Sequence, residues 1–215
     1  MTTIILVRHG TTAWNHERRY QGQLDIPLDQ TGEQEAIVVA QRLKNEKLDA
    51  IYSSQLSRAA RTAEIIADEL GGKLTVKTIV GLQEIDTGTW SGFTPPEAQK
   101  KFPEQFVAFE KDKNLPRGGG ESRDQLQTRT VAAVSQIARE HPGGTVVAVT
   151  HGAVIKVLAG WALQLPIQFQ PNFHGVVNGS LTYIEVELEP PRTRLAAYNL
   201  TSDGGSPLSV EMSEG

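Results

Sequence analysis

The sequence predicts an α/β protein, a three-layer α/β/α sandwich around a mostly parallel central sheet. Two apolar runs, Ile4–Val7 and Thr145–Thr150, are too short for helices and are typical of buried strands. Each run leads within one residue into a histidine followed by a glycine, at His9-Gly10 and His151-Gly152. Because helical segments separate the strands, we expect both strands to be parallel and to end at the same edge of one sheet.

The composition indicates a folded, globular protein. The chain has 215 residues, enough for one α/β domain with a sizeable core. Its formal net charge of -4 provides no strong field that would attract nucleic acid or an acidic membrane. Cysteine is absent, which excludes disulfides, cysteine-based zinc sites and thiol nucleophiles. No apolar run approaches membrane-spanning length and the chain opens directly on a strand, so we expect a cytoplasmic protein.

A long polar segment and a helix are expected after the first strand. Residues 16–30 show no clear period, and connections of this length in compact domains are often functional. Thr31 and Gln34 have the spacing of a capping box, which predicts a helix that starts at Thr31. The apolar face of this helix is expected at Ala36, Val39, Ala40 and Leu43.

A second strand and helix repeat the arrangement. Ala50–Ser54 is a short strand that leads into a helix with a continuous apolar stripe. Arg58 lies in the first turn of that helix, where the helix dipole disfavours a cation. It is either a solvated surface arginine, which is the usual case, or an anion-binding group directed at the strand ends. Leu74–Val80 alternates weakly and is expected to be an edge strand.

The remaining segments complete a single predicted domain over residues 1–201. Residues 85–121 form a candidate lid or insertion that contains two short helices broken at Pro103. Ser122 is expected to cap a long helix that ends near residue 140. Residues 178–187 alternate as a strand, with which residues 194–200 are expected to pair. The Gly- and Ser-rich residues 202–215 are predicted to be a flexible tail.

The strand ends would bring a set of charged side chains together. We expect Arg8, His9, Arg58, Glu84 and His151 to share one cleft. Two guanidinium groups suit a tetrahedral dianion such as phosphate, and a neutral imidazole is a competent phosphoryl acceptor. The second histidine, as a cation, would stabilise the equatorial oxygens, and the carboxylic acid would protonate a leaving alcohol. The set contains no group of metal ligands, so neither a metal nor a cofactor is expected.

The structural alternative is that these histidines only fill the ends of strands. A single histidine after an apolar strand is more often structural than catalytic. Two such histidines, each followed by glycine, favour the functional interpretation. The other three histidines, His16, His141 and His174, have no comparable context.

Several short motifs occur along the chain in a specific order. They are Leu6–Gly10, Trp14-Asn15 with Gln21-Gly22, Ser53-Ser54 with Arg58-Ala59, Glu84 with Gly119–Ser122, and Thr150–Gly152. This combination resembles the histidine phosphatase superfamily, also called the phosphoglycerate-mutase-like family, over about residues 3–190. The resemblance implies a phosphoglycerate-mutase-like fold and a covalent phosphohistidine intermediate.

The resemblance also implies a role for each matching residue. His9 would be the phosphorylated nucleophile and Glu84 the proton donor. The groups that would hold the phosphoryl group are Arg8, Arg58, His151, Asn15 and the backbone N–H of Gly152. The residues that would lie at the substrate entrance are Gln21 and Gly22.

The family contains mutases and phosphatases, and the segment after Glu84 favours a phosphatase. Mutases are similar to this chain up to Glu84 and then carry a longer insertion before the second histidine, whereas here Glu84 and His151 are 67 positions apart (151 − 84). A shorter lid leaves the site open to water. We therefore expect a metal-independent, histidine acid-type phosphatase that hydrolyses small phosphorylated metabolites. The alternatives are a cofactor-dependent phosphoglycerate mutase and a non-catalytic protein that binds a phosphorylated ligand.

The substrate is less well defined by the sequence than the reaction. Glu84–Gly92 looks similar to the matching segment of metal-independent phosphoserine phosphatases, which often have a histidine where this chain has Thr87. Phosphoserine, ribazole phosphate, and sugar or glycerate phosphates are therefore all candidates. The residues expected to select among them lie in 16–25, 86–120 and 168–178. We expect a monomer or homodimer that has no nucleic-acid or membrane partner.

Overall fold

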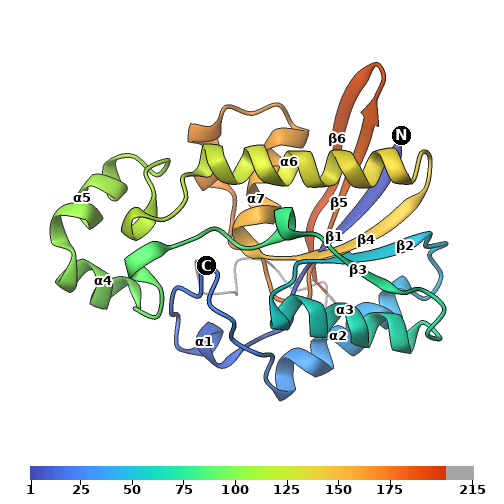
Figure 1. Ribbon diagram of the computed structural model, residues 1–215, viewed down its shortest axis with the longest axis horizontal. Coiled ribbons are helices and arrows are strands. Elements are labelled where there is room, and N and C mark those ends of the chain that lie inside the picture. Colours follow the sequence, from blue (N-terminus) through green and yellow to red (C-terminus); the bar gives the residue numbers. More distant parts are fainter. Residues whose placement is uncertain (202–215) are drawn as a thin grey trace.

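A six-stranded sheet forms the centre of the molecule (Figure 1). The computed structural model describes residues 1–201, so the predicted tail lies outside the described residues. The strand order is β3-β2-β4-β1-β5-β6, and the first four of these strands are parallel while β5 and β6 are antiparallel to their neighbours. The strands are β1 (Thr2–Arg8), β2 (Ala50–Ser53), β3 (Val76–Thr78), β4 (Thr145–Thr150), β5 (Leu181–Leu188) and β6 (Pro191–Leu200). The prediction of a mostly parallel sheet is confirmed.

Helices cover both faces of the sheet, which completes the three predicted layers (Figure 1). On one face lie α2 (Gln30–Leu43) and α3 (Ser57–Glu69), and on the other α6 (Arg123–Glu140) and α7 (Gly152–Ala162). Ser122 caps α6 as expected, because its hydroxyl accepts from the backbone N–H of Gln125.

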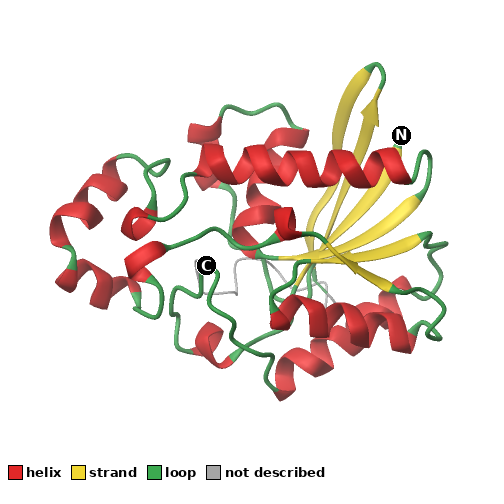
Figure 2. Cartoon of the chain, in the orientation of Figure 1, coloured by secondary structure: helices red, strands yellow, loops and turns green. Residues whose placement is uncertain are grey.

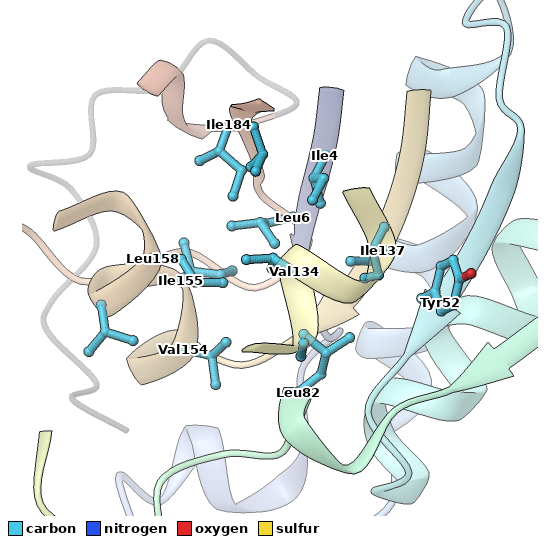
Figure 3. Close-up of a cluster of buried hydrophobic side chains, with 14 of the residues drawn as sticks. Ile4, Leu6, Tyr52, Leu82, Val134, Ile137, Val154, Ile155, Leu158 and Ile184 are labelled. Atoms are coloured by element: carbon cyan, nitrogen blue, oxygen red, sulfur yellow. The ribbon is translucent and has the colours of Figure 1, made fainter. Parts of the chain in front are cut away.

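Alternation along β1 divides the core between the two faces. Ile4 and Leu6 pack in the cluster beneath α6 and α7, which Figure 3 shows, whereas Ile5 and Val7 pack against α2 and α3. All four side chains are fully buried. Burial of a side chain of this kind contributes about 1.5–3 kcal/mol, so β1 is firmly fixed and its end is a rigid platform for Arg8 and His9.

A small helical lobe lies beyond the carboxyl ends of the parallel strands (Figure 2). It contains α4 (Pro95–Lys101), α5 (Pro103–Lys111) and two single 3₁₀ turns, Gly88–Trp90 and Arg117–Gly119. Trp90 is fully buried at its centre and stacks on Phe106, with ring centroids 5.4 Å apart. Tyr20 from the loop after α1 (Ala13–His16) also packs on Trp90. The lobe is therefore tied to the loop that follows the first strand.

The structure corrects three predicted boundaries. Helix α2 begins at Gln30 rather than Thr31, because the Asp29 carboxylate caps it by accepting from Gly32 N–H at 2.9 Å. The edge strand β3 covers only residues 76–78 of the predicted 74–80. Strand β5 begins at Leu181 rather than residue 178, after a turn at 178–180 that faces the site.

The segment between α7 and β5 contains a 3₁₀ helix at Ile167–Asn172. No helix in the described residues is both long and apolar enough to cross a membrane.

Candidate active site

Adjacent strands place the two histidines next to each other. In the β1–β4 ladder Arg8 lies opposite Thr150, so the residues that follow, His9 and His151, leave the sheet side by side. The backbone N–H of His9 donates to the Thr150 carbonyl at 2.9 Å, which extends the pairing by one step. The two imidazole rings have centroids 5.1 Å apart, as the expectation of parallel neighbouring strands requires.

The His9 imidazole is oriented as a nucleophile. Its Nδ1 lies 2.7 Å from the carbonyl oxygen of Gly10, so Nδ1 carries the proton and donates to that carbonyl. The lone pair of Nε2 is then free. Burial, together with the charges of Arg58 and Arg8, holds the pKa of His9 well below its usual value. His9 is therefore neutral at physiological pH, which is the state in which an imidazole attacks phosphorus.

His151 is fully buried and bonds to one partner in the described residues. Its Nε2 lies 2.9 Å from the Ser54 hydroxyl, while Nδ1 is buried without a hydrogen-bond partner. When Ser54 donates to Nε2, Nδ1 carries a proton that is available to a phosphoryl oxygen. Burial and the charge of Arg58 hold the pKa of His151 well below its usual value. The expected cationic form is thus disfavoured in the free protein, and a neutral donor is the better description.

Two buried guanidinium groups flank these rings. Arg8, at the end of β1, donates to the Val176 carbonyl, and Arg58, in the first turn of α3, donates to the carbonyls of Leu24 and Gly22 at 2.7 and 2.8 Å. In both residues Nε is buried without a partner. Burial lowers the pKa of Arg58 to about 10, so it stays charged at neutral pH. Of the two sequence interpretations of Arg58, the solvent-exposed one is wrong, since the side chain is fully buried.

Glu84 completes the set and is held from two sides. Its carboxylate accepts from the backbone N–H of Ile85 at 2.8 Å and from that of Ala153, in the first turn of α7, at 3.3 Å. Arg129 of α6 donates to the Glu84 carbonyl at 2.8 Å and forms a bidentate pair with Glu121 at 2.6 and 2.7 Å. These bonds fix the backbone that carries the carboxylate beside the two arginines.

The site opens to solvent through a narrow pocket with an empty volume of about 340 Å³. All ten of its lining residues come from the predicted set or from the loop after the first strand. The lining residues are Arg8, His9, Trp14, Asn15, Arg18, Arg19, Gln21, Gly22, Arg58 and Glu84.

Three of the four other predicted binding residues, Asn15, Gln21 and Gly22, line the pocket. Asn15 turns its Oδ1 to the N–H and hydroxyl of Thr12, both at 3.0 Å, which leaves its amide nitrogen for a ligand. Gln21 has a buried Oε1 without a partner, and Gly22 uses its carbonyl to hold Arg58. Gly152 does not line the pocket. It begins α7, and a Cβ at this position would lie 3.7 Å from Nε of Arg8.

Four residues of the site each have a buried polar atom without a hydrogen-bond partner. Arg8, Arg58 and Gln21 line the pocket, and His151, which does not line it, lies beside His9. Among the described residues, such atoms include Nε of Arg8, Nε of Arg58, Nδ1 of His151 and Oε1 of Gln21. Buried polar groups in native proteins nearly always have partners. Three of the four are donors, so the arrangement fits an anion with several acceptor oxygens.

The sequence interpretation did not assign roles to residues that position the site by hydrogen bonds without lining the pocket. Asn178 donates to the His9 carbonyl at 2.9 Å, and Ser54 orients His151. Glu35 of α2 accepts from the N–H and hydroxyl of Thr11 at 2.7 and 2.9 Å, which fixes the turn after His9. Ser54 was part of a recognised motif, whereas nothing in the sequence separates Asn178 or Glu35 from ordinary turn and helix residues.

In the described residues there is no group of three or more histidine, cysteine, aspartate or glutamate side chains that is arranged to hold a metal ion. Arg8 and Arg58 place two buried positive charges beside the histidines.

The fold and the site together define a protein that handles phosphoryl groups at the carboxyl edge of an α/β sandwich. Residues 4–201 match the model of the histidine phosphatase superfamily, branch 1, and the chain belongs to that family. The resemblance expected from the motifs is thereby confirmed.

Several relatives are named phosphatases. A metal-independent phosphoserine phosphatase of Arabidopsis thaliana is 41% identical over 74% of this chain and 67% of its own length. Phosphoserine phosphatase 1 of Hydrogenobacter thermophilus is 34% identical over 94% and 93%. The solved structure of a mycobacterial glucosyl-3-phosphoglycerate phosphatase with VO3 has a TM-score of 0.84 at 31% identity and covers 93% of this chain and 99% of that one. Other relatives are named phosphoglycerate mutase or mutase-like.

Proposed function

We propose that this protein hydrolyses phosphomonoesters of small metabolites through a phosphohistidine at Nε2 of His9. The observation that carries the proposal is the neutral His9, which holds its Nδ1 on the Gly10 carbonyl and lies among Arg8, Arg58 and His151, each with a buried nitrogen that has no partner. Membership of the histidine phosphatase superfamily and the names of the relatives support the same reaction.

In the first step, the lone pair of Nε2 attacks phosphorus and the bond from phosphorus to the ester oxygen breaks. Arg8, Arg58 and Nδ1–H of His151 hold the three non-bridging oxygens as their charge redistributes. Glu84, in its acid form, donates a proton to the leaving oxygen, so that the product is a neutral alcohol.

In the second step, the Glu84 carboxylate takes a proton from water, whose oxygen attacks phosphorus as the P–N bond breaks. The electron pair of that bond returns to Nε2, which restores neutral His9 and releases inorganic phosphate. Two arginines supply the charge neutralisation that a metal ion gives in other phosphatases. Together with the metal-independent relative, this supports a metal-independent, histidine acid-type phosphatase. We also propose that the protein is cytoplasmic.

We propose that residues 85–121 act as a short lid over the pocket and that water therefore reaches phospho-His9. The interval between Glu84 and His151 supports this, as do the phosphatase relatives. The mutase alternative requires a second substrate hydroxyl to take the phosphoryl group in place of water.

The pocket favours a small ester with a polar or anionic leaving group. Its lining includes Arg18 and Arg19 as well as Trp14. We assign contact with the leaving group to Arg18, which lines the pocket together with Asn15 and Gln21. A carboxylate-bearing phosphoester such as phosphoserine or a phosphoglycerate fits this charge, and the named substrates of the relatives support it.

The test is turnover of p-nitrophenyl phosphate in the presence of excess EDTA. We expect nitrophenol release that EDTA leaves unchanged and that His9→Ala abolishes. Activity that EDTA removes, or that survives in His9→Ala, would refute the proposal. Incubation of 3-phosphoglycerate with a bisphosphoglycerate primer then distinguishes the two enzymes, since a phosphatase releases inorganic phosphate and a mutase forms 2-phosphoglycerate.

A further inference from the structure

The segment 174–178, which precedes β5, supports the phosphate-binding residues from the antiparallel side of the sheet. The Val176 carbonyl accepts a hydrogen bond from the Arg8 guanidinium. Asn178 donates to the His9 carbonyl at 2.9 Å and lies 3.5 Å from Oδ1 of Asn15. The Val176 side chain is buried in the main core, so its carbonyl is fixed toward Arg8. A shift of this segment would move Arg8, His9 and Asn15 together.

Two neighbouring residues at the end of β6 hold the segment in turn. The buried Asn199 side chain accepts from the N–H of Val177 at 2.8 Å and donates to the Gly175 carbonyl at 3.1 Å. The Tyr198 hydroxyl donates to the His174 carbonyl at 2.9 Å. Tyr198 and Asn199 thus make three hydrogen bonds to the backbone of segment 174–178.

A β-bulge directs Asn199 at the segment. The pairing of β5 with β6 runs from Leu181 opposite Leu200 to Tyr183 opposite Ala197, so Thr182 faces two residues of β6. Asn199 has a φ of 54°, and its N–H donates to the Thr182 hydroxyl at 3.0 Å. Asparagine tolerates this left-handed conformation better than other residues with side chains. Bulges often serve to re-aim a side chain next to an active site.

We propose that Asn199 is a positioning residue that sets the Arg8 guanidinium, through segment 174–178, in its phosphate-binding place. Asn199 touches neither the pocket nor the phosphoryl group. The antiparallel strand β6 thereby helps to position Arg8, which stands at the end of the parallel strand β1. The inference rests on the proposed function, because it assumes that Arg8 binds phosphate.

The variant Asn199→Gly separates this role from backbone strain. Glycine adopts a φ of 54° without strain, so the bulge is retained while both side-chain hydrogen bonds are lost. The matched control is Thr193→Ala on the same strand, which removes one side-chain bond, from Thr193 to the Ala162 carbonyl at 3.1 Å, far from the site. The probes are inorganic phosphate binding by calorimetry, kcat and KM for p-nitrophenyl phosphate, and the urea midpoint.

In Asn199→Gly we expect phosphate binding to weaken and kcat to fall, each on the order of tenfold. Thr193→Ala should shift the urea midpoint but leave both quantities at the wild-type level. Wild-type phosphate binding in Asn199→Gly, or an equal loss in Thr193→Ala, would overturn the role of Asn199. A wild-type protein that binds phosphate without turnover would contradict the proposed function alone, and one that does not bind phosphate would overturn both.

Discussion

The imidazole rings of His9 and His151 lie with centroids 5.1 Å apart, and the buried side chains of Arg8 and Arg58 flank them. Burial disfavours a charged ring, and a proton on either ring would also add a third buried cation to this cluster. Both effects hold the pKa values of the two histidines well below the usual value. In the free protein the rings are therefore neutral, and under the proposed function a phosphoryl group would add negative charge beside the two arginines.

This arrangement predicts that the free protein loses stability in weak acid. The unfolded chain binds protons to these histidines near pH 6.5, whereas the folded protein does so only at lower pH. The stability they contribute is present above pH 6.5 and is lost as the pH falls toward the lowered values. The expected slope is about 1.4 kcal/mol per pH unit for each histidine. Urea unfolding between pH 5 and 8 measures it.

The control for this prediction is Thr193→Ala, which removes no titratable group. His9→Asn or His151→Asn should flatten the decline in the free energy of unfolding below pH 6.5, whereas Thr193→Ala should leave the slope of the decline unchanged. Saturating phosphate should also reduce the decline. An unfolding free energy that is independent of pH over this range would contradict the neutral-pair assignment.

Arg58→Lys should impair phosphate binding although the charge is retained. Two nitrogens of Arg58 donate to the carbonyls of Leu24 and Gly22, and its Nε is buried without a partner. The single ammonium group of lysine cannot occupy all three of these positions. We expect the inhibition constant of phosphate to rise by roughly tenfold or more, equivalent to about 1.4 kcal/mol. Arg61→Lys, one turn further along α3 and exposed, is the matched control. Equal constants in the two variants would contradict the role of Arg58.

Glu84→Gln should affect substrates according to their leaving group. Alkoxide leaving groups need the proton from Glu84, so turnover of phosphoserine should fall by about 100-fold or more. Nitrophenolate leaves without a proton, and p-nitrophenyl phosphate should therefore still phosphorylate the enzyme. Because the variant also lacks the base for the second step, we expect a burst of one equivalent of nitrophenolate and then slow turnover. Equal losses for both substrates without a burst would contradict the acid-base role.

The sequence was most informative about the candidate site where the type of residue and its place after a buried strand together point to one chemistry. Two buried strands that each lead into His-Gly predicted the edge of the sheet where the candidate site lies, and the parallel pairing of β1 with β4 places His151 beside His9. Asn178 and Asn199 were not predicted, because their roles depend on a bulge and a long-range contact that no local pattern reveals. The start of α2 was missed by one residue because Asp29, rather than Thr31, caps the helix.

Arg18→Gln should change which substrates are preferred. Arg18 lines the pocket, and its backbone has a φ of 56°, which is unusual for a residue other than glycine. We expect KM for phosphoserine to rise by about fivefold, close to 1 kcal/mol, and KM for phosphoethanolamine, which lacks the carboxylate, to stay unchanged. Arg61→Gln serves as the control. A parallel change in both values of KM would contradict recognition of a carboxylate by Arg18.

The central claim is that the phosphoryl group is carried by Nε2 of His9. The most direct measurement mixes the Glu84→Gln variant with p-nitrophenyl phosphate that carries radioactive phosphorus and quenches the reaction in alkali during the burst phase. Peptide mapping then locates the labelled residue, and phosphorus NMR of an unlabelled sample identifies the phosphorylated nitrogen. We predict one label per chain on Nε2 of His9, stable in base and lost in acid, and none in a variant that also carries His9→Ala. A label on another residue, or nitrophenol release with no labelled protein, would contradict the account.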